Sequence, residues 1–426
     1  MPNIDEKGLL FLKMFIAYSV GDMKPKTGVV IFAVTLGLLI AGMVWWRSIM
    51  DTNREACVNS RLELVQALSQ AEPGSTILVE PGVYEGGIYI ENLKGEPGKP
   101  IVIAAADPSD PPVIQGGREG LHLVDPAYVE IYNLTFVGAS YNGVNIDDGG
   151  SYDTPAHHIV LQGLTVMEIG PEGNRDGIKL SGVDDFVVRN CVVERWGTEG
   201  SAIDMVGCHR GIIEGCVFRY EDDVGSSGVQ VKGSSSDITI RRNRFEHAGR
   251  RAVNIGGCTD LQYFRPQPPP GYEAKNITVE GNVFIGSNAP IAFVGVDGAV
   301  VRFNTIYCPK RWVVRILQET AEPGFIPCRN GRFTDNIVVF ESHEISTTVN
   351  VGPGTLPRTF VFARNFWYAL DDPSLSHPSL PVDEVDGVYG LDPMFIDPEK
   401  GDFRLKPGSP AEGKGAYALS GEESSP

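Results

Sequence analysis

The sequence is short of positive charge, of paired cysteine motifs and of helical periodicity, and each shortage excludes a class of protein. Its 36 Lys and Arg stand against 54 Asp and Glu, a net charge of −18, which argues against a general nucleic-acid binder. Seven cysteines without a Cys-x-x-Cys motif favour neither a disulfide framework nor a zinc site, although Cys308 and Cys328 flank one loop and could pair. An α/β sheet fold is excluded because no helices separate the strand-like segments.

One segment, from Thr27 to Trp46, runs for 20 residues without a charge. As a helix it would span about 30 Å, the thickness of a bilayer core. Lysines precede it, so the positive-inside rule predicts a cytoplasmic segment 1–26, a transmembrane signal anchor 27–46 and a linker 47–58. The rest of the chain would then lie outside the cytoplasm, at the cell surface or in the periplasm. A cleaved signal peptide is the alternative, but no clear cleavage site follows.

Short alternating segments recur from Val129–Phe136 to Val361–Trp367, each a strand ending at a small turn residue. The turn residues are Leu134, Leu164, Cys191, Cys216, Asn243, Asn282, Asn304, Asn336 and Asn365. A period of about 25 residues is typical of solenoids. The asparagines predict a ladder in which side-chain amides bond backbone groups of neighbouring coils. The two cysteines in this column are expected to be buried small hydrophobes.

A second strand series alternates with the first: Gly143–Asp148, Gly177–Gly182, Ala202–Gly207, Gly228–Gly233, Ala252–Gly257 and Pro290–Gly295. Two or more strands per turn describe an all-β parallel β-helix over residues 59–416, followed by a tail, 417–426. The segment Asn59–Ala71 has apolar residues at helical spacing, so we expect a helix that caps the open N-terminal end.

The stretches "LVQALSQAEPGSTILVEPGVYEGG" and "KPIVIAAADPSDPPVIQGG", followed by the repeated strands, resemble right-handed parallel β-helix proteins. These include the chondroitinase B and alginate lyase family of polysaccharide lyases. The closing "DPMFIDPEKGDFRLKPGSPAEGKGA" is similar to the end of many β-helix carbohydrate-active proteins. The resemblance implies a right-handed β-helix that acts on a polysaccharide.

Stacking turns the second strand series into outward-facing columns of polar residues. Lyases of uronic-acid polymers need a base that takes the proton α to the carboxylate and a cation that holds the carboxylate. The resemblance implies that Lys232, at the end of such a strand, is the base. The supporting arginine position falls near Asn254 or Ile255, so we assign its role to Arg251 nearby. The simpler interpretation is that Lys232 is a solvated or ion-paired surface lysine.

The third residue of each strand forms one of these columns. In it, Lys179 and Asp204 lie in adjacent coils, either as an ion pair worth at most about 1 kcal/mol if exposed or as a substrate-binding pair with Asp204 as a general acid. Further candidates for binding sugar hydroxyls are Gln230, Asn254 and Arg250.

A hydrolase is a further reading, because "GNRDG" resembles the first acidic motif of the pectin hydrolases. It would use Asp176 and Asp204, at the separation of roughly 6.5–9.5 Å that inverting hydrolysis requires. His209 in "GCHRG" would bind substrate or be a plain turn residue.

Two long insertions, Cys258–Asn276 and Cys308–Asn330, are expected to build a wall of the site. Tyr263 and Trp312 within them would stack on sugars or plug the loop onto the coil, and Arg315 would point at the groove.

The acidic runs Asp147–Asp148 and Asp184–Asp185 suit Ca²⁺, but no spacing is diagnostic and the metal stays open. The family's calcium-holding acids are replaced by "GSSG", with Glu221, Asp222 and Asp223 close by.

The sequence therefore predicts a monomeric, membrane-anchored solenoid that takes an acidic polysaccharide and no nucleic acid. The leading hypothesis is a lyase-like or epimerase-like enzyme. A non-catalytic glycan-binding or cell-surface structural solenoid is the alternative, and a pectin-type hydrolase is the third.

Overall fold

The computed structural model describes residues 55–151 and 153–421. The chain divides into a unit of residues 1–55 and a compact unit of residues 56–426, and the second carries the fold. The uncharged run at residues 27–46 lies outside the described residues. Within the described ranges, no helix is long and apolar enough to cross a lipid bilayer.

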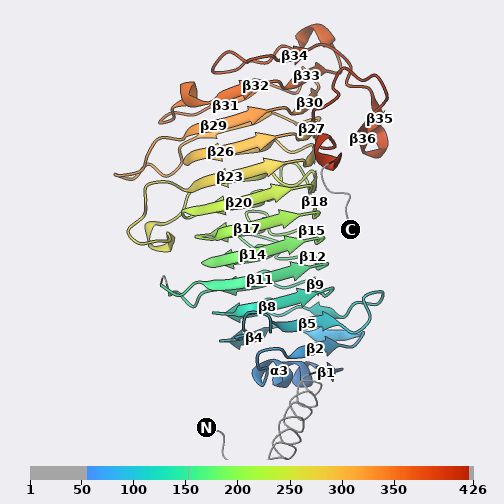
Figure 1. The fold of residues 1–426 in the computed structure, drawn as a ribbon, viewed down its shortest axis with the longest axis vertical. Coiled ribbons are helices and arrows are strands. Elements are labelled where there is room, and N and C mark those ends of the chain that lie inside the picture. The colour runs from blue at the N-terminus through green and yellow to red at the C-terminus, as the bar shows by residue number, and fades with distance from the viewer. Residues whose placement is uncertain (1–54, 152, 422–426) are drawn as a thin grey trace, which may run out of the picture. The chain divides into compact units, whose positions relative to one another are not determined.

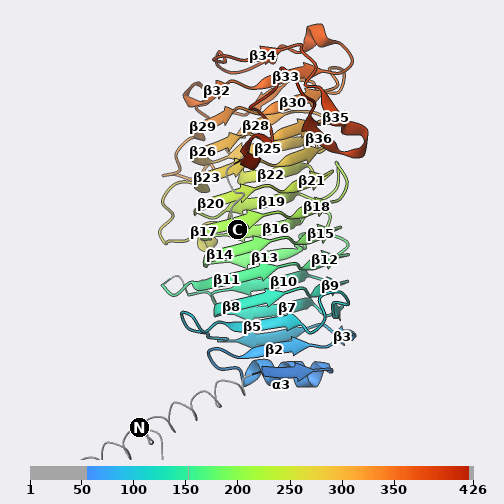
Figure 2. The ribbon, with the colours of Figure 1, turned by 45° about the vertical axis from the view of Figure 1, so that its right-hand side comes forward.

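The chain winds through three parallel sheets in turn and then returns to the first sheet one coil further on (Figures 1 and 2). Sheet A holds β1 (Glu55–Val58), β2 (Thr76–Val79), β5 (Ile101–Ala105), β8 (Ala127–Tyr132), β11 (Ala156–Gln162), β14 (Val183–Arg189), β17 (His209–Glu214), β20 (Ser235–Arg241), β23 (Ala274–Glu280), β26 (Val296–Arg302), β29 (Arg329–Thr334) and β32 (Val361–Ala363).

Sheet B follows sheet A in each coil. It holds β3 (Val83–Glu85), β6 (Val113–Gln115), β9 (Thr135–Val137), β12 (Thr165–Met167), β15 (Val192–Glu194), β18 (Val217–Arg219), β21 (Arg244–Glu246), β24 (Val283–Ile285), β27 (Thr305–Tyr307), β30 (Ile337–Phe340), β33 (Phe366–Ala369) and β34 (Val388–Tyr389).

Sheet C completes the coil and corresponds to the second predicted strand series. It holds β4 (Ile88–Glu91), β7 (Glu119–Val124), β10 (Asn142–Asp147), β13 (Ile178–Ser181), β16 (Ser201–Val206), β19 (Ser227–Lys232), β22 (Arg251–Gly256), β25 (Ala289–Val294), β28 (Val314–Leu317) and β31 (Val349–Val351). The predicted all-β parallel β-helix is thus confirmed.

The first predicted strand series is corrected in one respect: each segment is two strands rather than one. Val129–Phe136, for example, spans β8 and β9. The chain bends between them because the residue before the ladder position is left-handed, as at Asn133 (φ 55°) and Arg242 (φ 54°). That bend carries the chain from sheet A to sheet B.

The asparagine ladder lies at this bend. The amide N–H of Asn282 donates to Oδ1 of Asn304 (3.0 Å), and the N–H of Asn304 donates to Oδ1 of Asn336 (2.9 Å). Each ladder side chain also donates to a main-chain carbonyl, as Asn304 does to Val279 (3.0 Å). Cys191 and Cys216 continue the column and are buried, as predicted. The ladder satisfies polar backbone groups that the core would otherwise leave unpaired.

Replacing Asn304 with alanine is expected to lower the free energy of unfolding by about 2–4 kcal/mol. The change leaves the N–H of Asn282 and the carbonyl of Val279 without this partner, and each unsatisfied buried group costs about 1–3 kcal/mol. Chemical denaturation measures the loss. Asn174→Ala, at an exposed asparagine, is the control and should stay within about 0.5 kcal/mol of the parent. If Asn304→Ala and Asn174→Ala are equally stable, the asparagine ladder does not stabilise the fold as proposed.

The interior is filled by the inward-facing residues of the three sheets. Rings stack from coil to coil in sheet B, where Phe245 lies 4.8 Å from Phe218 and 4.7 Å from Phe284 between ring centroids. At the start of the domain, helix α3 (Arg61–Ser69) buries Leu64 and Leu68 in the same core. The helix forms within the range that the sequence predicts.

The chain leaves the regular coil at its C-terminal part. The hairpin strands β35 (Phe395–Asp397) and β36 (Asp402–Leu405) bury Phe395 and Phe403 in a cluster with Phe366 of sheet B. Short 3₁₀ turns occur at η1 (Leu261–Tyr263), η2 (Pro357–Thr359), η3 (Pro373–Leu375), η4 (Pro398–Lys400) and η5 (Ala418–Gly421).

The second predicted insertion, Cys308–Asn330, is not a loop throughout. It contains β28, because Val314 and Ile316 alternate with outward-facing residues and are fully buried. The two insertions pack together, since the ring centroids of Phe264 and Phe325 lie 5.2 Å apart. Cys308 and Cys328 are both free, so the disulfide considered for them is not formed.

Candidate functional site

The outer face of sheet C carries the predicted column of polar residues. The strand register places Asn145, Lys179, Asp204, Gln230, Asn254 and Ala292 in adjacent coils, and continues the column to Arg315 and Asn350. A two-residue period directs these side chains outward while their neighbours fill the core. Arg315 thus lies on a strand, in the same row as the other candidates.

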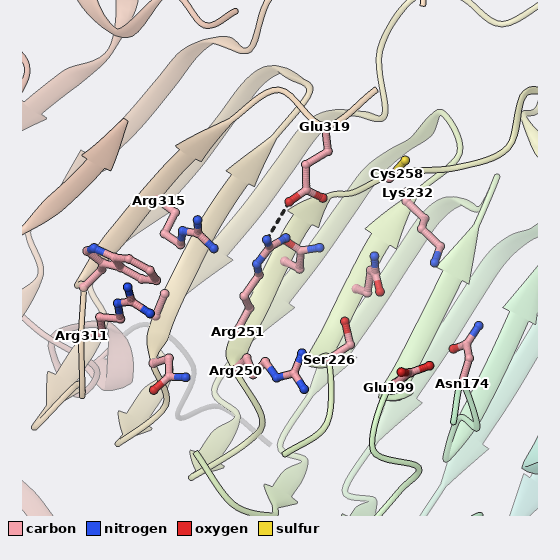
Figure 3. A pocket seen from close by; sticks show the side chains of 15 residues that line it. Asn174, Glu199, Ser226, Lys232, Arg250, Arg251, Cys258, Arg311, Arg315 and Glu319 are labelled. Carbon is pink, nitrogen blue, oxygen red and sulfur yellow. Dashed lines mark hydrogen bonds and ion pairs between the residues drawn. The ribbon is translucent and has the colours of Figure 1, made fainter. Parts of the chain in front are cut away.

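A groove of about 600 Å³ follows this face, and we call it the basic groove. It is lined by Asn174, Glu199, Ser226, Gln230, Lys232, Arg250, Arg251, Asn254, Cys258, Asn288, Ala289, Arg311, Trp312, Arg315 and Glu319. These residues come from the coils of six successive strands, β13 to β28, so the groove runs along the solenoid axis. Figure 3 shows Arg250, Ser226, Glu199 and Asn174 along one side and Glu319, Cys258 and Lys232 along the other.

The charge of the basic groove is opposite to that of the chain. Its basic lining residues are Lys232, Arg250, Arg251, Arg311 and Arg315, whereas its acidic ones are Glu199 and Glu319. The whole chain has a net charge of −18. A local excess of cations in a cleft attracts anionic ligands even on an acidic protein.

The Arg251 guanidinium extends to Asn254, near which the resemblance implies an arginine that the sequence lacks. Arg251 begins β22, but its Nη1 donates to Oδ1 of Asn254, three residues further on, at 3.2 Å. Its Nη2 forms an ion pair with Glu319 at 2.6 Å. Asn254 is one of the two positions, with Ile255, near which the resemblance implies the supporting arginine. The length of the side chain therefore compensates for the offset in sequence.

Trp312 is enclosed by two guanidinium groups rather than left free for a sugar. The guanidinium carbons of Arg311 and Arg315 lie 4.2 and 4.3 Å from its ring centroid. Arg315 also donates from Nε to Oδ1 of Asn350 (3.0 Å). Burial, followed by the nearby positive charge of Arg251, lowers the pKa of Arg315 below its ordinary value. An anion placed here would relieve the repulsion between these cations.

Lys232 is joined to a buried cluster of charges beneath the groove. Its amine lies 3.3 Å from Oδ1 of Asp204, and Lys179 contacts the other oxygen of the same carboxylate. Lys179 also lies 3.6 Å from Asp176. Asp204 is only 1% exposed, so the predicted Lys179–Asp204 ion pair is confirmed, but it is buried rather than solvated.

The pKa values of the two aspartates of this cluster are shifted in opposite directions. Burial would raise the pKa of Asp204, but Lys179 and Lys232 together lower it. Burial and the neighbouring charge of Asp204 raise the pKa of Asp176 to about 6. Both carboxylates contact the same lysine amine, so their nearest oxygens are closer than the roughly 6.5–9.5 Å of inverting hydrolysis. Neither lines the groove, which gives the hydrolase reading no geometric support.

The stability of the protein is expected to depend on pH through Asp176. Because its pKa is raised in the folded state, its contribution is complete below the unfolded pKa near 4 and is lost as pH rises through about 6. Asp176→Asn removes that dependence and keeps an oxygen for the Ser201 N–H, which Oδ1 accepts at 2.8 Å. Relative to this variant, the parent should lose up to about 3 kcal/mol between pH 4 and 8. Parallel stability–pH curves would contradict the assignment.

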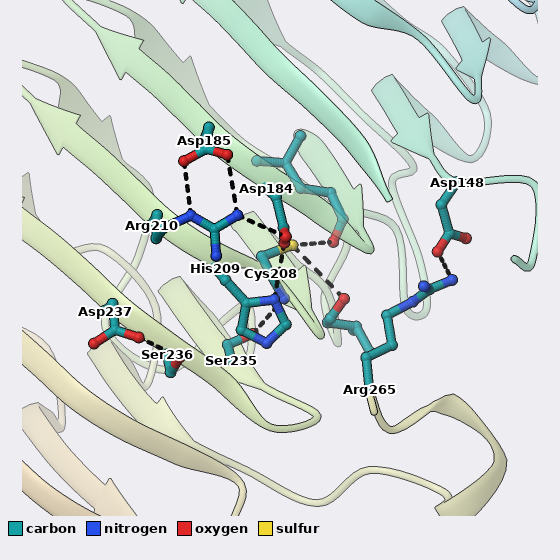
Figure 4. A network of polar contacts seen from close by, with 12 residues as sticks. Asp148, Asp184, Asp185, Cys208, His209, Arg210, Ser235, Ser236, Asp237 and Arg265 are labelled. Atoms are coloured by element: carbon teal, nitrogen blue, oxygen red, sulfur yellow. Dashed lines mark hydrogen bonds and ion pairs between the residues drawn. The ribbon is translucent and has the colours of Figure 1, made fainter. Parts of the chain in front are cut away.

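Two predicted site residues lie away from the basic groove. His209 is on sheet A, where Nδ1 lies 2.8 Å from Asp184 beside the Asp185–Arg210 ion pair (Figure 4). Tyr263 is 57% exposed on η1 and does not line the groove. The structure brings the other candidates together, either in the groove lining or in the buried cluster below it.

Sequence reasoning missed several lining residues: Glu199, Ser226, Asn288, Arg311 and Glu319. Ser226 and Asn288 directly precede a sheet C strand, Glu199 and Arg311 come two and three residues before one, and Glu319 follows β28. The strand period does not fix the conformation of these connections. The position shortly before a strand of the second series is the signal that could have found four of the five.

The acidic runs considered for calcium are already paired with protein cations. Asp147 lies 2.6 Å from Nε2 of His122, and Asp148 contacts Arg265 (Figure 4). Asp184 and Asp185 both bind Arg210. Of the acids near "GSSG", Asp222 lies 2.8 Å from His247. Because protein cations already occupy these carboxylates, their pairing does not fit a calcium site.

The long loop after β22 adjoins the groove through Cys258, which lines it. Arg265 lies over Gly182 and Gly207, where a side chain on either glycine would collide with it, and donates to the Ser151 carbonyl at 2.8 Å. The buried Glu273 accepts from the N–H of Gly233 and of Thr259, both at 2.9 Å. The loop is therefore fixed to the coils, and its role as a wall of the site stays a prediction.

The comparisons with known proteins agree with this architecture. The family model described as a right handed beta helix region matches residues 119–306. The chain is a right-handed parallel β-helix that resembles polysaccharide lyases. Probable pectin lyase D of Emericella nidulans is 23% identical over 182 residues, covering 39% of this chain and 48% of that protein. Pectin lyase B of the same organism is 21% identical over the same coverage.

Solved structures show the same fold at low sequence identity. Pectate lyase Pel9A has a TM-score of 0.50 at 16% identity, covering 82% of this chain and 85% of that one. A rhamnogalacturonan lyase has a TM-score of 0.52 at 12% identity, covering 79% and 85%. The chain spans about half the length of the curated relatives it matches. These likenesses establish the fold, and the chemistry has to be argued from the site.

Proposed function

We propose that this protein binds an acidic polysaccharide in the basic groove and acts on it by β-elimination, or by epimerisation through the same proton abstraction. The observation that carries the proposal is the groove lining: five cationic side chains against two acidic ones, on a chain of net charge −18. Uronate carboxylates are the sugar groups that such a lining would bind. The pectin lyase relatives support a lyase-like assignment.

The groove offers a base and cations that could support β-elimination. The proton on the carbon α to the uronate carboxylate passes to the base, while the glycosidic oxygen on the β carbon leaves with its bonding electrons and takes a proton from water, giving an unsaturated sugar. Arg251 and Arg315 would hold the carboxylate and stabilise the negative charge that develops on it. Lys232 would take the proton, and Gln230 and Asn254 would bind hydroxyls.

A non-catalytic glycan-binding solenoid is the second candidate, and one contact favours it. The Lys232 amine lies 3.3 Å from the buried carboxylate of Asp204. To act as a base, this amine would have to break the ion pair before it could reach the proton of a sugar. Binding needs no such step, because a charged lysine attracts a carboxylate directly.

The location of the protein and the closure of its N-terminal end are also part of the proposal. We propose that residues 27–46 anchor the protein in a membrane with the solenoid outside the cytoplasm, supported by their uncharged sequence and by the preceding lysines. We further propose that α3 closes the N-terminal end of the core, since Leu64 and Leu68 are buried against it. The solenoid is expected to act as a monomer.

Incubation of the purified protein with a panel of uronic-acid polymers tests the enzymatic proposal. We expect one polymer to yield products with the ultraviolet absorbance of an unsaturated uronate. A change in uronate configuration without that absorbance indicates the epimerase. Binding without either product supports the second candidate, and absence of both binding and product contradicts the proposal as a whole.

A further inference from the structure

A second cluster of cations lies beyond the end of the basic groove. The ring of Tyr141 has the guanidinium carbon of Arg118 at 4.5 Å from its centroid and that of Arg175 at 4.4 Å. Arg118 and Arg175 belong to the preceding and following coils, so the ring holds two guanidinium groups of neighbouring coils close together. We call these three residues the distal cluster.

The distal cluster adjoins the basic groove. Arg118, Tyr141 and Arg175 come shortly before β7, β10 and β13, on the side of sheet C where its strands begin. Asn174, which precedes Arg175, lines the near end of the groove, and Arg175 donates to its carbonyl at 3.0 Å. The row that Figure 3 shows along one side of the groove is therefore extended by the distal cluster.

The far end of the same row also has an aromatic ring between two arginines. Trp312, shortly before β28, is flanked by Arg311 and Arg315 of its own coil, whereas Tyr141 is flanked by Arg118 and Arg175 of the neighbouring coils. Sheet C places six coil steps between β10 and β28, or about 29 Å at ~4.8 Å a step. Two aromatic-centred arginine pairs thus mark the two ends of one polar row.

Four arginines of this row form no ion pair within the residues that the structure describes: Arg118, Arg175, Arg250 and Arg311. Many other outward-facing arginines of the solenoid are paired, as Arg219 is with Glu194 and Glu246 at 2.8 and 2.5 Å. Unpaired cations that aromatic rings hold in place are a binding surface for anions.

We propose that the distal cluster is a second anion subsite, and that one acidic sugar chain lies along the solenoid axis from Trp312 to Tyr141. The inference rests on the proposed function of the basic groove. An extended sugar chain advances about as far per residue as the solenoid does per coil, ~5 Å, so about six sugars span the row. The protein would therefore select its ligand by length as well as by charge.

The test is binding of size-fractionated oligosaccharides, from two to ten residues, prepared from polygalacturonate, alginate and chondroitin sulfate. For at least one of these polymers we expect the full-length protein to bind oligomers of six or more residues at least about tenfold more tightly than trimers. Arg118→Gln with Arg175→Gln should remove this gain and leave trimer binding unchanged. The single variant Arg118→Gln changes only an exposed residue, so it should fold even if the double variant does not. It should remove part of the gain in affinity for long oligomers.

Arg332→Gln is the matched control, because Arg332 is an exposed arginine of β29 in sheet A. It should bind all lengths as the parent does. If long and short oligomers bind equally well, and the double variant binds like the parent, the distal subsite is wrong while the basic groove stands. If no oligomer of any length binds, the proposed function itself fails.

Discussion

Replacing Lys232 with alanine is expected to reduce formation of unsaturated product by about 10²–10⁴-fold, the usual contribution of a positioned base. Binding of the polymer should change by no more than a few-fold, because the four arginines of the groove remain. The fold should be kept, since Asp204 retains its contact with Lys179. Product formation and binding are measured on the same preparation.

Lys400→Ala is the control for this variant. Its side chain is 83% exposed, and it pairs with Asp397 in the C-terminal part of the chain. The control should keep both product formation and binding. A Lys232 variant that forms product at the parent rate would show that another group takes the proton. A parent protein that binds polymer without forming product would favour the binding solenoid.

Replacing Asp204 with asparagine is expected to lower the free energy of unfolding by about 3–5 kcal/mol, the usual result of breaking a buried ion pair on one side. The change leaves the amines of Lys179 and Lys232 without their shared carboxylate, and Asp176 is the remaining acid at 3.6 Å from Lys179. Thermal or urea unfolding followed by circular dichroism measures the loss.

A double variant separates the effect of unpaired charge from that of lost packing. Asp204→Leu with Lys179→Met removes both members of the pair and leaves apolar side chains of similar size. We expect it to recover part of the stability lost in Asp204→Asn, because neither member of that pair is then buried alone, whereas Asp176 loses its contact with Lys179. A single variant as stable as the parent, or a double variant as unstable as the single one, would contradict this account of the cluster.

The columns of the solenoid could be predicted because a two-residue strand period and a repeating coil leave little freedom. Asn282, Asn304 and Asn336 recur at the same turn, so the ladder follows from the sequence alone. The row of sheet C follows in the same way, since Lys179, Asp204 and Gln230 occupy equivalent strand positions. The fold and the sheet C row that forms the floor of the groove are thus local consequences of the repeat.

The rest of the groove depends on long side chains and on connections whose conformation the repeat does not fix. The sequence places no arginine in register with Lys232, yet the Arg251 side chain crosses three residues to reach Asn254. Lys232 and Asp204 meet diagonally, from different positions of adjacent strands. Arg311 and Glu319 lie on connections whose course depends on the packing of the loops.

Burial also could not be predicted from the repeat alone. Asp204 faces outward by its period, which predicts a solvated ion pair, but Lys179 and Lys232 both contact its carboxylate and only 1% of the residue is exposed. Trp312 is an apparent sugar platform in the sequence, yet two arginines already occupy its surroundings. The contacts of Asp204 come from neighbouring coils, whereas those of Trp312 come from residues close in sequence whose side-chain conformations the repeat does not fix.

The most direct test of the central claim compares binding of polygalacturonate with binding of the same polymer after full methyl esterification, at low and high salt. The basic groove predicts that the acidic polymer binds, that salt weakens this binding, and that the neutral ester binds at least about tenfold more weakly. Equal binding of the two polymers, without dependence on salt, would contradict recognition of the glycan by its negative charge.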